Sequence, residues 1–145
     1  MSVFKAYDIR GIAGEDLNAE FADKLGKSIV AHLGARCVAV ARDIRESGPE
    51  LHDSFIRGIM DSGCDVMDLG VTTTGVLYRA SKDLDVDVSV MITASHNPPE
   101  YNGFKICKGT LPMAGEELQE LRETMERESF KEGKGSLFDM HGFQN

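Results

Sequence analysis

The residues best suited to chemistry lie together in the segment 93–98, Thr-Ala-Ser-His-Asn-Pro. Ser95 has an imidazole and an amide beside it, from His96 and Asn97, so the segment could serve catalysis at a serine oxygen. The same residues are also typical of a Ser/Thr or Asx turn closed by Pro98, which on the pattern alone is the commoner outcome. Both interpretations place Ser95 in a loop.

A lysine follows this loop. Lys105 comes ten residues after Ser95, beyond two prolines and the turn pair Asn102-Gly103. If the chain folds back as a hairpin, Lys105 returns toward Ser95. Otherwise Lys105 is a solvated surface lysine, and the sequence by itself leaves both alternatives open.

Two further polar loops follow apolar runs in the same way. Residues 42–48 (RDIRESG) follow the run 37–41, and residues 72–75 (TTTG) follow the run 64–69. In open α/β sheets, ligands bind beyond the carboxyl ends of the strands. We therefore expect these two loops and the Ser95 loop to meet at one edge of a sheet.

The elements that would position these loops alternate between helix and strand. Apolar residues at helical spacing predict four helices, and β-branched or apolar runs predict strands. Expected helices cover about 18–33, 49–63, 76–82 and 116–129, and expected strands cover 37–41, 64–69, 86–93 and 104–107. This order predicts an α/β fold: a single three-layer α/β/α domain around a mostly parallel, mixed sheet of about four strands. The link between the last two strands holds no helix, so that pair should be antiparallel.

Composition narrows the class of protein. The chain of 145 residues has a formal net charge of −8, whereas nucleic-acid binding needs clustered positive charge. No apolar run approaches the ~20 residues of a membrane-spanning helix, and the amino terminus lacks the pattern of a secretion signal. The three cysteines and four histidines show no metal-ligand spacing. We expect a cytoplasmic protein with reduced thiols and neither nucleic-acid nor membrane partners.

Three segments carry a family resemblance. FKAYDIRG (4–11), RDIRESG (42–48) and TASHNPPEYNGFK (93–105) occur in this order over most of the chain. Together they resemble the first domain of the α-D-phosphohexomutases, the phosphomannomutase and phosphoglucomutase group. Ala41 departs from the glycine of many members, and the three threonines at 72–74 depart from the Pro-Thr-Pro run of many relatives.

The resemblance implies a reaction at Ser95. In this family, a phosphoserine at the matching position donates its phosphoryl group to a hexose monophosphate, and a bisphosphorylated sugar forms. The other phosphate then returns to the serine, so that phosphate moves between the 1- and 6-positions of mannose, glucose or both. The resemblance places Arg10 and Lys105 near the phosphate as cations, and it makes Lys105 the candidate for proton transfer.

The resemblance also implies roles for other residues of these segments. His96 joins the catalytic set, where it shapes the loop and donates hydrogen bonds. The side chains expected to contact the sugar phosphate are those of Tyr7, Asn97 and Asn102. The side chains expected to brace the loop from behind are those of Asp43, Arg45 and Thr93, although Asp43 and Arg45 could equally form a plain exposed ion pair.

The remaining expectations concern what lies beyond this domain. Residues 1–131 would form the phosphoserine-bearing domain, and residues 132–145 a linker toward a second domain. Mg²⁺ would take most of its ligands from that second domain and only an oxygen of Ser95 or its phosphate from this one. The isolated chain should then be inactive and could self-associate through surface that the remaining mutase domains normally cover. The alternative is a non-catalytic module that binds a sugar phosphate or a partner chain.

Overall fold

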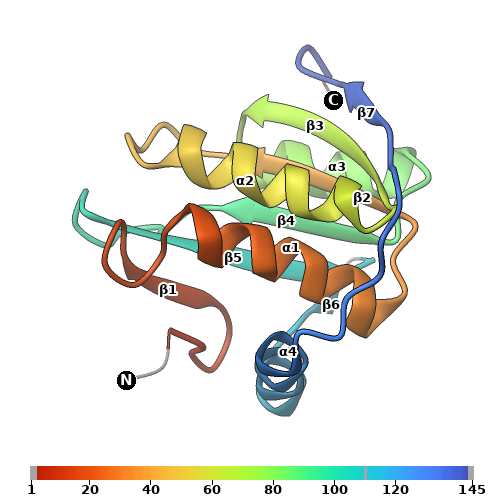
Figure 1. Cartoon of the computed structure of the whole chain (residues 1–145). Coiled ribbons are helices and arrows are strands. Elements are labelled where there is room, and N and C mark those ends of the chain that lie inside the picture. The colour runs from red at the N-terminus through yellow and green to blue at the C-terminus, as the bar shows by residue number, and fades with distance from the viewer. Residues whose placement is uncertain (1–2, 110, 144–145) are drawn as a thin grey trace.

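A mixed β-sheet forms the middle of the computed structural model, which describes residues 3–109 and 111–143. The strands lie in the order β1-β5-β4-β2-β3-β7, and β6 pairs with β5 (Figure 1). Their bounds are β1 Ile9–Ile12, β2 Cys37–Arg42, β3 Asp65–Val71, β4 Val88–Ile92, β5 Tyr101–Lys108, β6 Leu111–Pro112 and β7 Leu137–Asp139.

The pairing confirms the expected mixed sheet. Strand β2 lies parallel to both β3 and β4, and β7 lies parallel to β3. Strand β5 runs antiparallel to β4, as its short connection predicts, and also antiparallel to β1. Over residues 3–109 and 111–143 the sheet has seven strands, rather than the expected number of about four. The three unexpected strands are four, two and three residues long, too short to show a periodic pattern in the sequence.

The described residues form four helices: α1 Ala19–Leu33, α2 Gly48–Asp61, α3 Thr74–Asp83 and α4 Glu116–Arg127. Helix α1 begins where the Asn18 side chain accepts a hydrogen bond from the Phe21 amide, and it ends at Gly34 in the left-handed conformation. Helices α1 and α2 lie on one face of the sheet and α3 on the other, which gives the predicted three layers (Figure 1).

Each face of the sheet buries its own apolar cluster. Alternate residues of β2 and β4, such as Val40 and Ile92, join the α1/α2 side, and Leu121 of α4 joins the same cluster. Ala41 and Met91 face α3 instead. This alternation fixes the register of the strands, because a slip by one residue would exchange the two faces.

Helices α1 and α2 touch each other closely through two glycines. A Cβ atom on Gly26 would lie 2.5 Å from the Phe55 carbonyl oxygen, and one on Gly58 would collide with the Asp23 backbone. Because α2 follows the 42–48 loop directly, this close contact also fixes the position of the carboxyl end of that loop.

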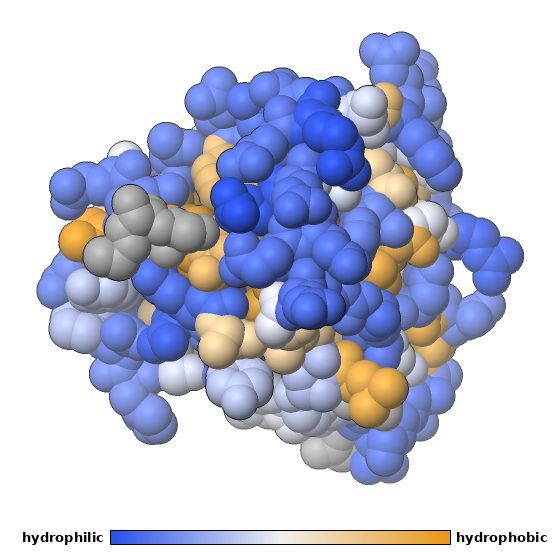
Figure 2. Space-filling view, turned by 90° about the horizontal axis from the view of Figure 1, so that it is seen from below, coloured by the Kyte–Doolittle hydropathy of each residue, from blue (hydrophilic) through white to orange (hydrophobic). Residues whose placement is uncertain are grey.

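The face seen from below, to which α4 belongs, is mainly hydrophilic with small separate apolar patches (Figure 2). No helix among the described residues is long and apolar enough to span a membrane. Within the expected linker 132–145, residues 137–139 form β7, and the boundary with a second domain remains a prediction.

Candidate functional site

Ser95 lies just beyond the carboxyl end of β4 and is exposed. The residues before it, Thr93 and Ala94, are buried, so the chain leaves the sheet only at the serine. Ser95 has a φ of 54°, the left-handed conformation that residues other than glycine rarely adopt. Its hydroxyl makes no hydrogen bond within the described residues and is therefore available to a ligand.

The Ser95 amide is connected through the Thr93 hydroxyl to Asp43, which directly follows the neighbouring strand β2. The Ser95 N–H donates to the Thr93 hydroxyl over 3.0 Å, and that hydroxyl donates to the Asp43 carboxylate over 2.5 Å. The Asp43 amide in turn donates to the Ile92 carbonyl of β4 over 3.1 Å. Asp43 and Thr93 therefore lie behind the loop, as expected, and connect it to both β2 and β4.

The Ser95 carbonyl is held by Arg45. The guanidinium Nη2 donates to the carbonyl oxygens of Ser95 and Asn97, at 2.8 and 2.9 Å. Nη1 donates to the carbonyl oxygens of Pro98 and Tyr101, at 2.7 and 3.0 Å. Nε lies 3.4 Å from the Asp43 carboxylate, and the Arg45 side chain is only 12% exposed. The alternative of a plain exposed ion pair is therefore wrong for Arg45, which is nearly buried and bonds to four main-chain carbonyls as well as to Asp43.

The two expected cations lie on the same face of the sheet. In the register of β1 and β5, Arg10 pairs with Gly103, and Lys105 is two residues further along β5. Arg10 can lie across β5 because Gly103 has no side chain: a Cβ there would come within 2.8 Å of the Arg10 Cγ. Both residues are thus directed to the face that Met91 shares, opposite to α1 and α2.

Arg10 contacts the serine loop and Lys105 does not. Arg10 Nη1 donates to the Asn97 side-chain oxygen over 2.8 Å, and Nε pairs with the largely buried carboxylate of Asp8 over 3.0 Å. Lys105 is exposed and makes no hydrogen bond or ion pair within the described residues. Arg10 is therefore held in place by two partners, whereas Lys105 is free to reach a ligand.

The remaining candidates differ in accessibility. Tyr7 is 77% exposed and His96 is exposed, so both could meet a substrate. Asn97 is half-buried and its side-chain oxygen is taken by Arg10. Asn102 is 0% exposed, and its amide donates to the Ser47 hydroxyl over 2.8 Å. In this structure, Asn102 supports the hairpin from inside and offers no surface to a sugar.

Two open hollows flank the serine loop, and Asn97 lines both. One has a volume of about 480 Å³ and lies beside Ser95 and Arg45; the other, of about 410 Å³, lies beside Arg10. The first is lined by Asp43, Ile44, Arg45, Glu46, Ser95, Asn97 and Pro99, and the second by Val3, Lys5, Arg10, Gly11, Ile12, Asp16, Asn97 and Tyr101. The loop thus separates two spaces, each of which one side of a ligand could enter.

Sequence reasoning missed two supporting residues of this site. Asp8 orients Arg10, and Ser47 anchors the hairpin through Asn102. Both lie inside the segments 4–11 and 42–48, but nothing in their spacing shows which partner they contact. Only the register of β1, β5 and β4 brings them to the loop.

A second polar cluster lies between α2, β3 and the segment after β7. The His52 ring nitrogens lie 2.8 Å from the Asp68 carboxylate and 2.9 Å from that of Asp53, and His141 lies 3.2 Å from the other Asp68 oxygen. Burial lowers the pKa of His52, but its bonds to the two carboxylates outweigh burial and leave the pKa raised. Burial raises the pKa of Asp68, but bonds from His52, the Gly70 amide and His141 leave it lowered.

The described residues contain no group of three or more His, Cys, Asp or Glu side chains arranged to hold a metal ion. The three cysteines are free thiols. Burial raises the pKa of Cys37 to about 11 and that of Cys64 to about 12, so these two thiols stay protonated at neutral pH.

Comparisons with known proteins agree with the geometry. The family model "phosphoglucomutase/phosphomannomutase, alpha/beta/alpha domain I" matches residues 1–132. The chain is 48% identical over 139 residues to a phosphomannomutase/phosphoglucomutase of Pseudomonas aeruginosa PAO1, covering 94% of this chain and 30% of that protein. It is 44% identical to a phosphoglucomutase of Neisseria meningitidis MC58, covering 97% of this chain and 32% of the relative.

A solved structure shows the same fold. The crystal structure of a phosphoglucomutase/phosphomannomutase family protein from Burkholderia thailandensis superposes with a TM-score of 0.89 at 37% identity, covering 96% of this chain and 33% of that one. The chain thus spans about a third of the length of the relatives it matches. The match over residues 1–132 places this chain in the phosphoglucomutase/phosphomannomutase family, as its alpha/beta/alpha domain I.

Proposed function

We propose that this chain is the phosphoserine-bearing domain of a mutase that interconverts hexose 1-phosphate and hexose 6-phosphate of mannose, glucose or both. The observation that carries the proposal is the Ser95 hydroxyl, which is exposed, free of hydrogen bonds and held beyond the end of β4 by a fixed backbone. The names of the relatives supply the substrate class.

Ser95 would act as a carrier. Its Oγ–P bond breaks while a new P–O bond forms to a hydroxyl of the bound sugar monophosphate, and the sugar becomes bisphosphorylated. The other phosphoryl group then returns to the Ser95 oxygen. Because the serine ends as it began, the net change is the position of the phosphate on the sugar.

The cations near the loop fit this chemistry. A phosphoserine adds about −1.5 to −2 charges at neutral pH. Arg10 reaches the loop through Asn97, and Lys105 lies on the same face of β5 with its ammonium unpaired within the described residues. Phosphoryl transfer depends mainly on positioning and on stabilising charge at the equatorial oxygens, which two such cations can do. Lys105 could also relay a proton: its ammonium would donate one to the Ser95 oxygen as the Oγ–P bond breaks, and the resulting amine would take up the proton of the attacking sugar hydroxyl.

Magnesium would find only one ligand in this part of the protein. The unpartnered Ser95 oxygen, or its phosphate, can coordinate a hard cation, whereas the Asp43 carboxylate beside it is engaged by Thr93 and Arg45. Bound there, Mg²⁺ would stabilise negative charge on the transferred group. We expect its other ligands to come from a further domain, and for that reason we expect the 145-residue chain alone to show no turnover of mannose 1-phosphate.

The test is a chimaera in which this chain replaces the matching amino-terminal 30% of the Pseudomonas aeruginosa relative. The chimaera should convert mannose 1-phosphate or glucose 1-phosphate into the 6-phosphate, and Ser95→Ala should abolish that conversion. Ser129→Ala, which changes an exposed serine just beyond α4, should not. A folded chimaera in which Ser95→Ala keeps its activity would contradict the proposal, and binding of the sugar phosphate without conversion would favour a non-catalytic module.

A further inference from the structure

We infer that Arg45 is a positioning residue: it holds Ser95 in the left-handed conformation through main-chain carbonyls and is not a ligand of the phosphoryl group. The inference rests on the proposed function only for the role of Ser95, because the geometry of the loop stands without it.

The first argument is a count of donors. A guanidinium has five N–H groups. Nε is directed to Asp43, Nη1 donates to two carbonyl oxygens and Nη2 to two more. All five donors therefore have partners inside the domain. Arg10 differs, because within the described residues its guanidinium bonds only to Asp8 and Asn97. A phosphate could recruit Arg45 only by breaking the loop's own bonds.

The second argument concerns what keeps Ser95 strained. Among the described residues other than glycine, only Ser95 and Glu128 have positive φ. Glu128 ends α4 as its C-cap, where a left-handed residue is common. Ser95 ends no helix, so the surrounding structure must impose its conformation. Within the described residues, the Ser95 backbone makes only two hydrogen bonds: its amide donates to the Thr93 hydroxyl, and its carbonyl accepts from Arg45.

The third argument is that both bonds lead to the same support. Thr93 donates to Asp43, and Arg45 Nε also points to Asp43. Asp43 is itself tied to β4 by its amide. Asp43, which directly follows β2, therefore supports both the amide and the carbonyl of Ser95, through Thr93 and Arg45 respectively. The Ser95 side chain remains exposed. Arg45 acts on Ser95 without contacting the side-chain oxygen.

Lysine could not replace Arg45 in this role. Four carbonyl oxygens converge on two nitrogens that lie in one plane, and a lysine offers three donors on a single nitrogen. Lysine at position 45 would keep the charge and lose the fork that spans residues 95–101. Arg45→Lys therefore tests whether the loop needs the shape of the guanidinium or only its positive charge.

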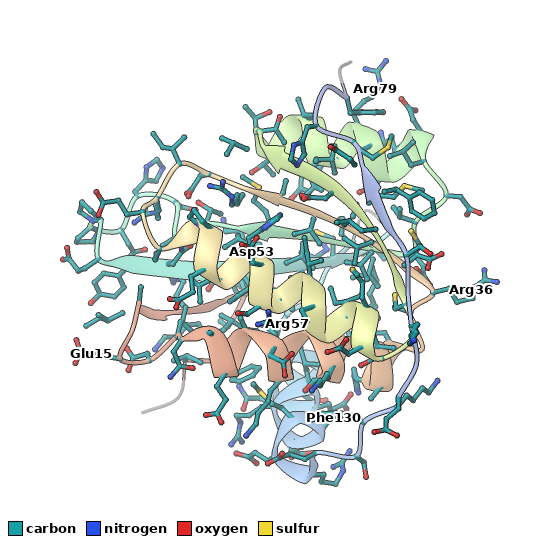
Figure 3. The ribbon with its side chains drawn as sticks, turned by 45° about the horizontal axis from the view of Figure 1, so that its top comes forward. Glu15, Arg36, Asp53, Arg57, Arg79 and Phe130 are labelled. Atoms are coloured by element: carbon teal, nitrogen blue, oxygen red, sulfur yellow. The ribbon has the colours of Figure 1, made fainter. Side chains whose placement is uncertain are left out.

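The experiment is NMR of the ¹⁵N,¹³C-labelled chain with Arg45→Gln, Arg45→Lys and the control Arg79→Lys. Arg79 points outward from α3 (Figure 3), and among the described residues it pairs only with Asp83. The Ser95 HN–Hα coupling and Cα shift report φ directly. We expect both Arg45 variants to lose the left-handed signature and to exchange the Asn97 amide, which bonds to the Ala94 carbonyl, at least tenfold faster. The control should match the unchanged chain.

An unaltered Ser95 signature in Arg45→Gln would overturn the inference. If that variant does not fold, as judged by far-ultraviolet circular dichroism, Arg45→Lys carries the test because it keeps the charge. A second arm installs phosphoserine at position 95: the Arg45 Nε–H resonance should stay in place, and a large shift with loss of loop order would make Arg45 a phosphate ligand instead. A failure of the mutase proposal would show as absent turnover in the chimaera and would leave the loop measurements unchanged.

Discussion

Two polar clusters of this domain use similar side chains in opposite ways. Around the serine loop, two polar groups are exposed and unpaired within the described residues: the Ser95 hydroxyl in the loop and the Lys105 ammonium on β5. Beside β3, His52 and Asp68 are buried and bonded to each other at 2.8 Å. The first cluster keeps its reactive groups available, while the second satisfies its own groups internally.

Under the proposed function of Ser95, the difference shows which features of a polar cluster accompany catalysis. Raised and lowered pKa values occur at His52 and Asp68 because each stabilises the charge of the other, and structural ion pairs shift pKa values as readily as active sites do. At Ser95 the indicator is a strained backbone that the surrounding bonds hold in place. If this comparison is right, mutations in one cluster should change activity and mutations in the other should change stability.

The largest expected effect is on activity. Lys105→Met in the chimaera should lower turnover by about 10²–10⁴-fold, since it removes a cation and the candidate group for proton transfer from the face that Arg10 shares. Its free energy of unfolding should change by less than about 0.5 kcal/mol, because the side chain is exposed and unpaired within the described residues. Steady-state kinetics and urea unfolding measure the two quantities. Equal activity with lysine or methionine at position 105 would contradict the claim that the exposed groups around Ser95 determine activity.

The reverse pattern is expected in the buried cluster. Asp68→Asn should lower the free energy of unfolding by about 2 kcal/mol, because it removes the charge that His52 needs in a buried place. Asp53→Asn is the matched control: its side chain also contacts His52 but is 75% exposed, and we expect a loss below about 1 kcal/mol (Figure 3). Urea unfolding of both variants measures the two losses. A larger loss of unfolding free energy for Asp53→Asn would show that burial of the carboxylate does not determine the size of the loss.

Removal of the Thr93 hydroxyl, which supports the serine loop from behind, should lower the free energy of unfolding somewhat less than Asp68→Asn does. Thr93→Val keeps the shape of the side chain but leaves the Asp43 carboxylate and the Ser95 amide without their shared partner. We expect a loss of about 1–2 kcal/mol in urea unfolding. Thr72→Val is the control, because the Thr72 side chain makes no hydrogen bond within the described residues. No difference between the two variants would remove Thr93 from the set of supporting residues.

The smallest expected effect is on pH dependence. The raised pKa of His52 gives stability that is complete below its ordinary value of 6.5 and is lost as the pH rises through the raised value. The lowered pKa of Asp68 gives stability that is complete above 3.8 and is lost as the pH falls through the lowered value. The difference in stability between the unchanged chain and Asp68→Asn should therefore be greatest between these two values. A difference independent of pH would contradict the ion pair.

The sequence predicts the parts of this fold that rest on local patterns. Leu25 and Ile29 at helical spacing, with Asn18 before them, mark α1, and both are buried in the structure. The short link before β5 correctly predicts an antiparallel pair. By contrast, β7 was missed because its three residues are exposed and gain order only by pairing with β3. Local spacing carries no information about such a partner.

The same limit applies to the site. The order of motifs is enough to bring Ser95, Arg45 and Asp43 to one edge of the sheet, since each follows a strand. It does not show that Asn102 turns inward to Ser47, because that depends on the exact register of β5. Nor does it show that the Arg45 guanidinium reaches four backbone carbonyls. Contacts to the main chain leave no pattern in the residue types that receive them.

The central claim is that the Ser95 oxygen carries the phosphoryl group. The most direct measurement is phosphopeptide mass spectrometry of the chimaera after incubation with a hexose 1,6-bisphosphate and Mg²⁺. We expect one phosphate on the peptide that contains Ser95 and none in Ser95→Ala. A phosphate on any other residue, or turnover with no phosphorylated enzyme, would contradict it.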